Sequence, residues 1–201
     1  MVLSAFNKDT AKNLQLGAGI ICRGITNPLK PDEEELKTKC VGATEGGASF
    51  SATPEVNNLF DGLDDAVGKY KGGLQITSIE VKLSFTMKEM TAKNFQMAMG
   101  SADIVKASSL ESPYEDSSDV NADILVPRLD VKDGDFIDNI CWYGLKKDGT
   151  KICIVLHNAY NEGGLTYSSE SEGKGSLEVE MQAYFDLEDP TKVPYEIILF
   201  N

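Results

Sequence analysis

The sequence of 201 residues contains a single histidine, His157, and four cysteines, none of them in a C-x-x-C pair. Zinc sites usually combine histidine and cysteine at short, fixed spacings. A zinc site is therefore poorly supported, and we expect no cofactor. Because Cys22, Cys141 and Cys153 lie in apolar surroundings, we expect reduced thiols in a protein core. Cys40 lies in a stretch with little periodicity.

Long hydrophobic runs are missing as well. The longest aliphatic run, 152–156, is about a quarter of the roughly 20 residues that a membrane-spanning helix needs. The first ten residues have neither a basic head nor the continuous apolar stretch of a secretory signal. We therefore expect no membrane anchor, and a protein that is made and kept in a cytosol.

Basic residues are few. The chain has 19 Lys and Arg against 32 Asp and Glu, a formal net charge of −13. Such a field repels phosphate backbones, so specific nucleic-acid binding is disfavoured. An acidic balance also simply keeps a protein soluble, and composition alone favours that interpretation.

Signatures of catalysis are weak. His157 follows the apolar run 152–156, and Cys153 would lie on the same side of that strand but beyond hydrogen-bond reach. The glycines at 17, 19 and 24 do not have the G-x-G-x-x-G spacing of a dinucleotide-binding loop. Glycines inside a strand more often indicate a bulge or a close approach of another backbone. We therefore expect a protein that is not an enzyme.

Acidic residues are abundant without forming a recognisable site. A calcium loop is one interpretation of the acidic run around Gly134, but the EF-hand order is missing. That run consists of Asp130, Asp133, Asp135 and Asp138. No pair of carboxylates is singled out for glycoside hydrolysis, because their separation in space is not visible in a sequence.

What the sequence does have is strand-like alternation. Residues 79–88 and 177–184 alternate apolar and polar side chains, which is typical of strands with one wet face. Apolar runs at 140–145 and 151–156 flank Asp148-Gly149 and predict a β-hairpin. Further strands are expected at 15–24, 48–56 and 195–200.

One short helix is expected at 92–99, with Thr91 as its cap and Gly100 at its end. These elements predict a mainly β fold: an antiparallel β-sandwich or barrel of about seven strands with the helix packed at its edge. We expect a single domain, 1–201, with an N-terminal arm, 1–13, and long loops at 26–47, 57–73 and 101–138.

Trp142 and Tyr143 are adjacent on a predicted strand and so point to opposite faces. One of them could lie in the core while the other is exposed as an interface anchor, although burial of such aromatic residues is at least as common.

The stretch 41–55 resembles the early strands of phage major tail proteins, the tube-forming subunits of long-tailed phages. Neighbouring features agree in order: Leu16-Gly17-Ala18-Gly19, Asp61-Gly62 and Lys71-Gly72-Gly73, then 80–83 leading into 91–95. The C-terminal strand, followed by Asp189-Pro190 and 193–198, is similar too. The resemblance covers roughly 14–100 and 177–200, while 101–138 matches nothing in that family.

This resemblance implies a β-sandwich whose copies join into hexameric rings, which stack as a hollow tube for DNA passage in a virion tail. Its partners would be further copies of itself and tail proteins such as the tape measure, tail terminator and distal tail proteins, with assembly in the bacterial host cytoplasm. DNA would pass without specific binding, because phosphate binding depends on basic groups.

Two groups of residues are candidates for roles in such a tube. The polar faces of the alternating strands are candidates for lining the lumen: Glu80, Lys82, Ser84, Glu178, Glu180 and Gln182. The loop 57–73 is a candidate for contacts between rings, as is the arm 1–13; the loop residues are Asp61, Gly62, Asp64, Asp65, Lys69 and Lys71.

Two other classes of function stay open at this point. A carbohydrate-binding or adhesive β-sandwich module would expose aromatic residues in a concave patch. A hydrolase would place two acidic residues facing each other in a cleft.

Overall fold

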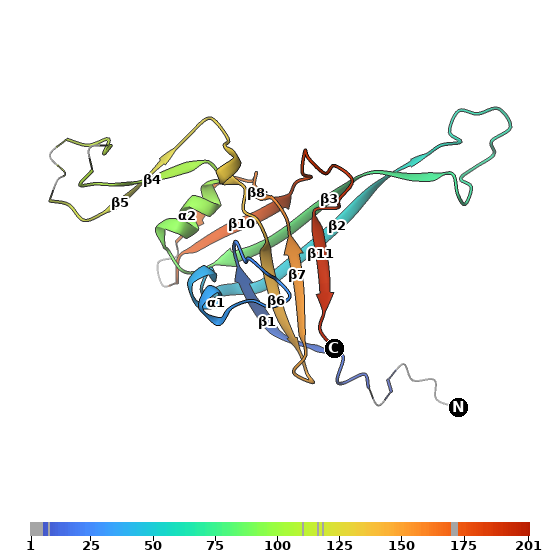
Figure 1. Cartoon of the computed structure of the whole chain (residues 1–201), viewed down its shortest axis with the longest axis horizontal. Coiled ribbons are helices and arrows are strands. Elements are labelled where there is room, and N and C mark those ends of the chain that lie inside the picture. The colour runs from blue at the N-terminus through green and yellow to red at the C-terminus, as the bar shows by residue number, and fades with distance from the viewer. Residues whose placement is uncertain (1–5, 8, 110, 116, 118, 170–172) are drawn as a thin grey trace.

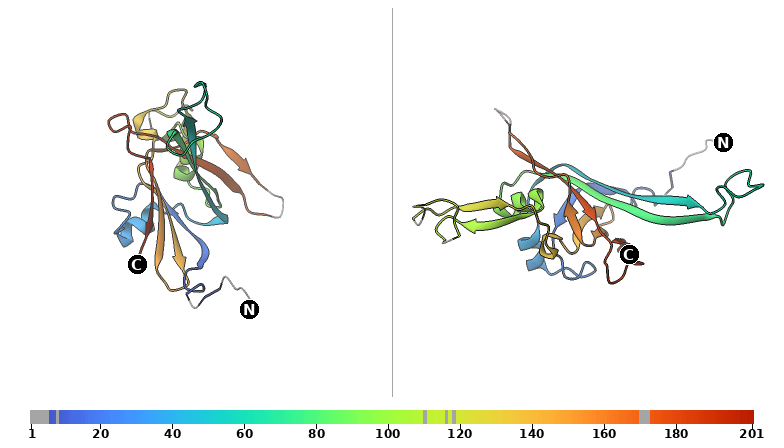
Figure 2. Two further views of the ribbon diagram at one scale, coloured as in Figure 1. Left: turned by 90° about the vertical axis from the view of Figure 1, so that its right-hand side faces the viewer. Right: turned by 90° about the horizontal axis from the view of Figure 1, so that it is seen from above.

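The computed structural model describes residues 6–7, 9–109, 111–115, 117, 119–169 and 173–201. Two antiparallel sheets form the body of the molecule (Figures 1 and 2). The first sheet has the strand order β1-β6-β7-β11. Its strands are β1 (Gln15–Cys22), β6 (Ile140–Lys146), β7 (Lys151–Leu156) and β11 (Tyr195–Leu199). The hairpin predicted around Asp148-Gly149 is confirmed as β6–β7.

The second sheet has the order β2-β3-β10-β8, with β9 also paired to β10. Its strands are β2 (Thr44–Asn58), β3 (Leu74–Met87), β8 (Ala159–Asn161), β9 (Thr166–Ser168) and β10 (Ser176–Ala183). The predicted alternation is confirmed in β3 and β10, where every second side chain is buried over 81–87 and 177–183. The short strands β8 and β9 were not predicted.

The main core lies between the two sheets. Leu83 and Met181, in register on β3 and β10, pack in the same cluster as Ile140 and Leu156 of the first sheet. Each such side chain stabilises the fold by about 1.5–3 kcal/mol when fully removed from water. The predicted mainly β sandwich with a short helix is therefore confirmed.

The predicted helix is confirmed as α2 (Ala92–Met99). Thr91 accepts a hydrogen bond from the Asn94 amide, and Gly100 ends the helix with a φ of 75°. The helix contacts β8 and β10 of the second sheet as well as β4 (Ala102–Lys106) and β5 (Asp123–Pro127). It therefore packs where the sandwich meets a separate hairpin.

A second helix, α1 (Glu33–Lys39), lies within the expected loop 26–47, which is a correction. It carries one apolar residue in the middle, Leu36, so it shows no hydrophobic periodicity. Leu36 packs on the outer face of the first sheet, in a second cluster that includes Tyr143 and Val155. The part of the first sheet around Cys22, Tyr143 and Val155 is thus covered on both faces.

The expected loop 101–138 is also corrected. It contains the antiparallel hairpin β4–β5 and a short 3-10 turn, η1 (Asp133–Asp135). This hairpin projects from one end of the body, while the much longer β2–β3 hairpin projects from the other (Figures 1 and 2). Among the described residues, no helix is long and apolar enough to cross a membrane.

Candidate functional site

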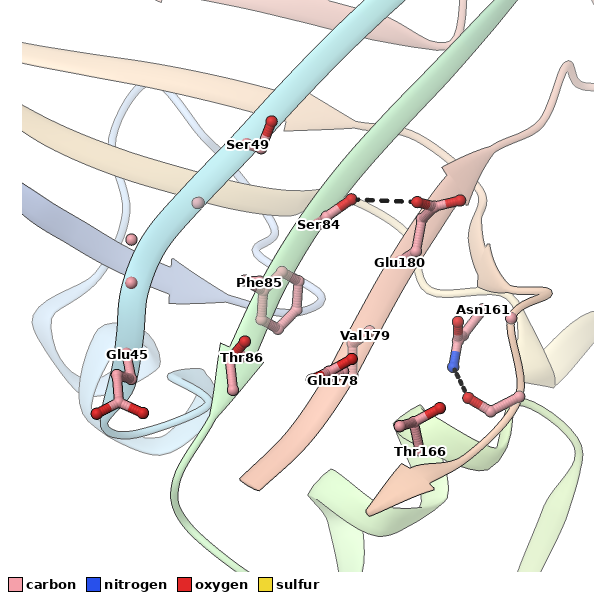
Figure 3. A pocket seen from close by; sticks show the side chains of 15 residues that line it. Glu45, Ser49, Ser84, Phe85, Thr86, Asn161, Thr166, Glu178, Val179 and Glu180 are labelled. Atoms are coloured by element: carbon pink, nitrogen blue, oxygen red, sulfur yellow. Dashed lines mark hydrogen bonds between the residues drawn. The ribbon is translucent and has the colours of Figure 1, made fainter. Parts of the chain in front are cut away.

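The solvent-facing side of the second sheet forms a shallow, polar trough of about 530 Å³ (Figure 3). Its floor consists of side chains that lie opposite one another on β2, β3 and β10. Ser84 on β3 is flanked by Ser49 on β2 and Glu180 on β10, and its hydroxyl donates to the Glu180 carboxylate at 3.4 Å. One step along, Thr86 is flanked by Glu45 and Glu178.

The candidate lumen residues of β3 and β10 all belong to this face. Lys82 contacts Glu80 at 2.8 Å and Glu180 at 3.2 Å between charged atoms. The hydrogen bond to Glu80, followed by that to Glu180, raises the pKa of Lys82 above its usual value. Gln182 is paired with Lys82 across the strands. The structure thus brings together the six residues that alternation placed on two separate strands.

The trough also contains residues that sequence reasoning missed. Glu45 comes from the expected loop 26–47, while Asn161 and Thr166 come from the unpredicted strands β8 and β9. Carboxylates outnumber the basic groups on this face, so it is electronegative. Phe85 is the one aromatic residue among those that line it, and it is buried in the core beneath.

The candidate inter-ring residues lie together at the tip of the β2–β3 hairpin (Figure 1). Asp61, Gly62, Asp64, Asp65, Lys69 and Lys71 are all exposed there. The tip keeps a defined shape, because Asn58 donates to Asp61 at 2.6 Å and the rings of Phe60 and Tyr70 pack edge to face. The expected loop 57–73 is thus the end of a long β-ribbon.

This ribbon has apolar side chains that the sandwich does not cover. The first five residues of β3, 74–78, are all exposed, although they alternate in direction. At the tip, Val67 is 93% exposed and Leu63 is 56% exposed. The further exposed large hydrophobic side chains of the ribbon are Val56, Leu59, Phe60, Tyr70, Leu74 and Ile76.

The N-terminal arm lies only partly within the described residues: 1–5 and 8 of the expected arm 1–13 fall outside them. Its described part has a local turn, in which the Lys12 amide donates to the carbonyl of Asp9. Leu14, immediately after the arm, accepts from the Lys147 amide at 2.9 Å beside the β6–β7 turn.

The acidic run around Gly134 is held by an arginine. Arg128 approaches Asp135 at 2.5 Å, Asp103 at 3.0 Å and Asp130 at 3.6 Å. These carboxylates therefore serve as ion-pair partners at the base of the β4–β5 hairpin. In the described part of the chain, no group of three or more His, Cys, Asp or Glu residues is arranged to hold a metal ion.

His157 lies one residue beyond β7 and is oriented by its neighbours. Its Nδ1 is 2.8 Å from Asn139 Oδ1, and its Nε2 is 3.6 Å from the Glu196 carboxylate. Cys153 is buried in the second cluster, on the outer face of the first sheet. The structure provides no nucleophile beside this histidine among its hydrogen-bond partners in the described chain.

Trp142 and Tyr143 point to opposite faces, as expected, but both are buried, at 7% and 8% exposure. The interface-anchor interpretation is therefore wrong, because the segment around α1 covers Tyr143, whose hydroxyl donates to the Pro28 carbonyl. The expected bulge is confirmed between Leu16 and Ile20 on β1.

No family model matches the sequence, and no curated protein matches it. Among solved structures, a chain described as "Virion of native gene transfer agent (GTA) particle" matches with a TM-score of 0.41 and 10% identity. The alignment covers 94% of this chain and 100% of the other. A likeness of this size assigns no function to the chain.

Proposed function

We propose that this protein is a non-enzymatic structural subunit that self-assembles into hexameric rings stacked as the tail tube of a phage or phage-like particle. The observation that carries the proposal is the projecting β2–β3 ribbon, whose apolar side chains face solvent in the single chain. The family resemblance of the sequence agrees with it.

An isolated two-stranded ribbon is at best marginally stable in water. Here β2 and β3 have 15 and 14 residues, and among the described residues no third strand pairs with their distal parts. A ribbon with exposed Leu63, Val67 and Ile76 is therefore expected to gain stability by packing on another surface. A neighbouring copy in a stacked ring would supply that surface.

Ring formation would use the edges of the second sheet. β2 is a long edge strand, and β8 and β9 lie at the opposite edge. Exposed edges favour pairing with other chains, and a head-to-tail contact with six-fold rotation closes without leaving any edge free. Such closure would direct the polar trough of each copy toward a common axis.

An electronegative lumen would suit the passage of DNA. Phosphates bind where basic groups release counterions, so a face lined by Glu45, Glu178 and Glu180 would let a duplex slide without binding. The tape measure, tail terminator and distal tail proteins would be the further partners in the virion tail, which would assemble in the bacterial host cytoplasm.

The two alternatives gain no support from the trough. A carbohydrate platform needs exposed aromatic rings, whereas Phe85 is buried under the trough. Glu178 and Glu180 lie two positions apart on one strand. Glu45 and Glu178 lie on opposite sides of Thr86, so their backbones are two strand spacings, about 10 Å, apart, and do not form a narrow cleft.

The proposal is tested by electron microscopy and light scattering of the full chain at rising concentration, with preformed tube ends added as seeds if it stays monomeric. Hollow tubes of uniform diameter are expected. Discrete monomers that neither polymerise alone nor extend seeds would contradict the proposal.

A pair of variants separates the role of the ribbon from a general effect of exposed apolar residues. The double change Leu63→Ser and Val67→Ser at the ribbon tip should leave a folded monomer that forms no stacked tubes. The control is Leu187→Ser, which removes a leucine that is 98% exposed and lies outside the ribbon. Equal tube formation by both variants would rule out the tip as the stacking contact.

A further inference from the structure

Cys22, the last residue of β1, is paired with Cys40, the residue after α1, in an isolated antiparallel bridge. The backbone bonds that define this bridge belong to the flanking residues. The Arg23 amide donates to the Lys39 carbonyl at 3.0 Å, and the Val41 amide donates to the Ile21 carbonyl at 2.9 Å. Cys22 and Cys40 therefore form a non-hydrogen-bonded pair.

In an antiparallel ladder, a non-hydrogen-bonded pair has the shorter of the two Cα separations. Directly opposite residues of a non-hydrogen-bonded pair have Cα atoms about 4.5 Å apart, with side chains on the same face. A disulfide spans Cα atoms about 4.4–6.8 Å apart. The Cα separation expected for Cys22 and Cys40 thus falls within the range of a disulfide, and both are free thiols here.

Solvent access, rather than distance, separates Cys40 from the other thiols near Cys22, because a disulfide also spans Cα atoms about 5.5 Å apart. Cys141 lies opposite Cys22 on the β6 side. Because the amide and carbonyl of successive strand residues point to alternate sides, Cys22 makes its ladder bonds toward β6 and forms the wide pair, about 5.5 Å, with Cys141. Cys141 and Cys153 are also completely buried, so an oxidant in water does not reach them.

We propose that Cys22 and Cys40 are a disulfide-forming pair, with Cys40 as the oxidant-reactive thiol and Cys22 as the thiol that resolves it. The link would clamp the segment 23–39, including α1, onto the first sheet whenever the protein meets an oxidising environment. In a reducing cytosol the pair would stay as thiols.

The solvent access of the two thiols and the pKa of Cys40 both support these roles. Cys40 is half-buried and lines an open pocket of about 340 Å³ together with Arg23 and Lys93, whereas Cys22 is fully buried. A hydrogen bond with the Cys22 thiol, together with backbone bonds from Gly42 and Val41, lowers the pKa of Cys40 below its usual value. Reaction with an oxidant requires the thiolate form, which is thus favoured at Cys40.

Hydrogen peroxide is the only co-reactant that formation of this disulfide requires. The Cys40 thiolate attacks one peroxide oxygen and breaks the O–O bond, which gives a sulfenic acid and, after protonation, water. The Cys22 sulfur then attacks the sulfenic sulfur, its proton leaves with the hydroxyl as a second water, and the S–S bond forms. Two thiols are oxidised and one hydrogen peroxide is reduced to two waters.

The test maps the thiols of the purified full chain before and after treatment with hydrogen peroxide. Remaining thiols are blocked with N-ethylmaleimide in denaturant, and peptides are identified without reduction. A peptide linking positions 22 and 40 is expected, with Cys141 and Cys153 recovered in alkylated form. Recovery of both Cys22 and Cys40 as alkylated thiols, or a link from Cys22 to Cys141, would overturn the proposal.

A thermal measurement checks the clamp independently. Closing a loop of this length should raise the melting temperature of the oxidised protein by roughly 6–12 °C, reversibly with dithiothreitol. Cys40→Ser should lose both the link and the shift, and Cys153→Ser is the control that keeps both. An unchanged melting temperature in wild type that carries the mapped link would refute the clamp. If either variant fails to fold, the peptide map of the wild type still decides the pairing.

Discussion

Gly19 lies against the indole ring of Trp142, and a Cβ atom at position 19 would be 2.6 Å from Trp142 Nε1. The same indole donates to the neighbouring Ala18 carbonyl at 2.9 Å. The β1 bulge thus exists where the backbone wraps around the tryptophan, and a glycine is required at that point.

A pair of glycine substitutions tests this relationship. Gly19→Ala should destabilise the fold by about 3 kcal/mol or more, because it adds the clash to the cost of a left-handed backbone. Gly17 has nearly the same positive φ, 77° against 76°, but no described residue beyond its chain neighbours lies within 4 Å of a Cβ at position 17. Gly17→Ala should cost only about 1–2 kcal/mol. Urea denaturation measures both, and equal losses would contradict the contact.

Asn94 joins three segments from the first turn of α2. Its buried amide donates to the carbonyls of Val41 and Glu89, at 2.8 and 2.9 Å. Asn94→Ala should cost about 2–4 kcal/mol, because two carbonyls lose their partner. Lys93→Ala, an exposed change on the same helix, should stay within about 0.5 kcal/mol. Chemical denaturation of both variants checks this, and a near-neutral Asn94→Ala would disprove the role of the amide.

The hydrogen bonds of Glu35 predict that the stability of the fold depends on pH. Hydrogen bonds from Lys39 and Thr26 lower the pKa of Glu35 from 4.5 to about 2. A lowered folded-state pKa stabilises the fold above the ordinary value, and this contribution is lost as pH falls from 4.5 through about 2.

Glu35→Gln should therefore lower the melting temperature at pH 7 but not near pH 2, relative to wild type. Glu34→Gln, on the exposed side of the same helix, is the control and should show little difference at either pH. A constant gap between Glu35→Gln and wild type across the range would show that the carboxylate does not act through its charge.

Lumen lining is tested by the accessibility of a new thiol in assembled tubes. In a Cys40→Ser background, Ser84→Cys on the polar face should react with a small maleimide but be protected from a large polymer-linked maleimide. Leu187→Cys, which replaces a strongly exposed residue away from the trough, should react with both. Equal labelling of the two positions by the large reagent would place the trough on the outside of the tube.

Local sequence patterns predicted the strands and the helix that bury one face against the core. The strands β3 and β10 alternate because one side lies on the core, and α2 has a cap, an apolar face and a terminating glycine. The helix α1 lacked such a pattern, since Leu36 alone anchors its middle. Its signal was electrostatic: Asp32 as the cap, acidic residues in the first turn and lysines in the last.

The elements that were missed bury little or are very short. β8 and β9 have three residues each, too few to show a period. Residues 74–78 of β3 have neither face on the core, so nothing in their sequence separates them from a loop, whereas the stretch 48–56 of β2 was predicted as a strand. β4 and β5 likewise pair with each other outside both main sheets.

The sequence by itself determined which side chains of each half-buried strand are polar, where the tight turn of β6–β7 falls and where α2 begins and ends. These features depend on neighbours within a few residues. Only the tertiary structure decided that Glu45 and Glu178 share one trough, that Tyr143 is covered, and that Cys22 lies opposite Cys40. Such contacts join distant parts of the chain, and their free energy arises from packing that leaves no local pattern.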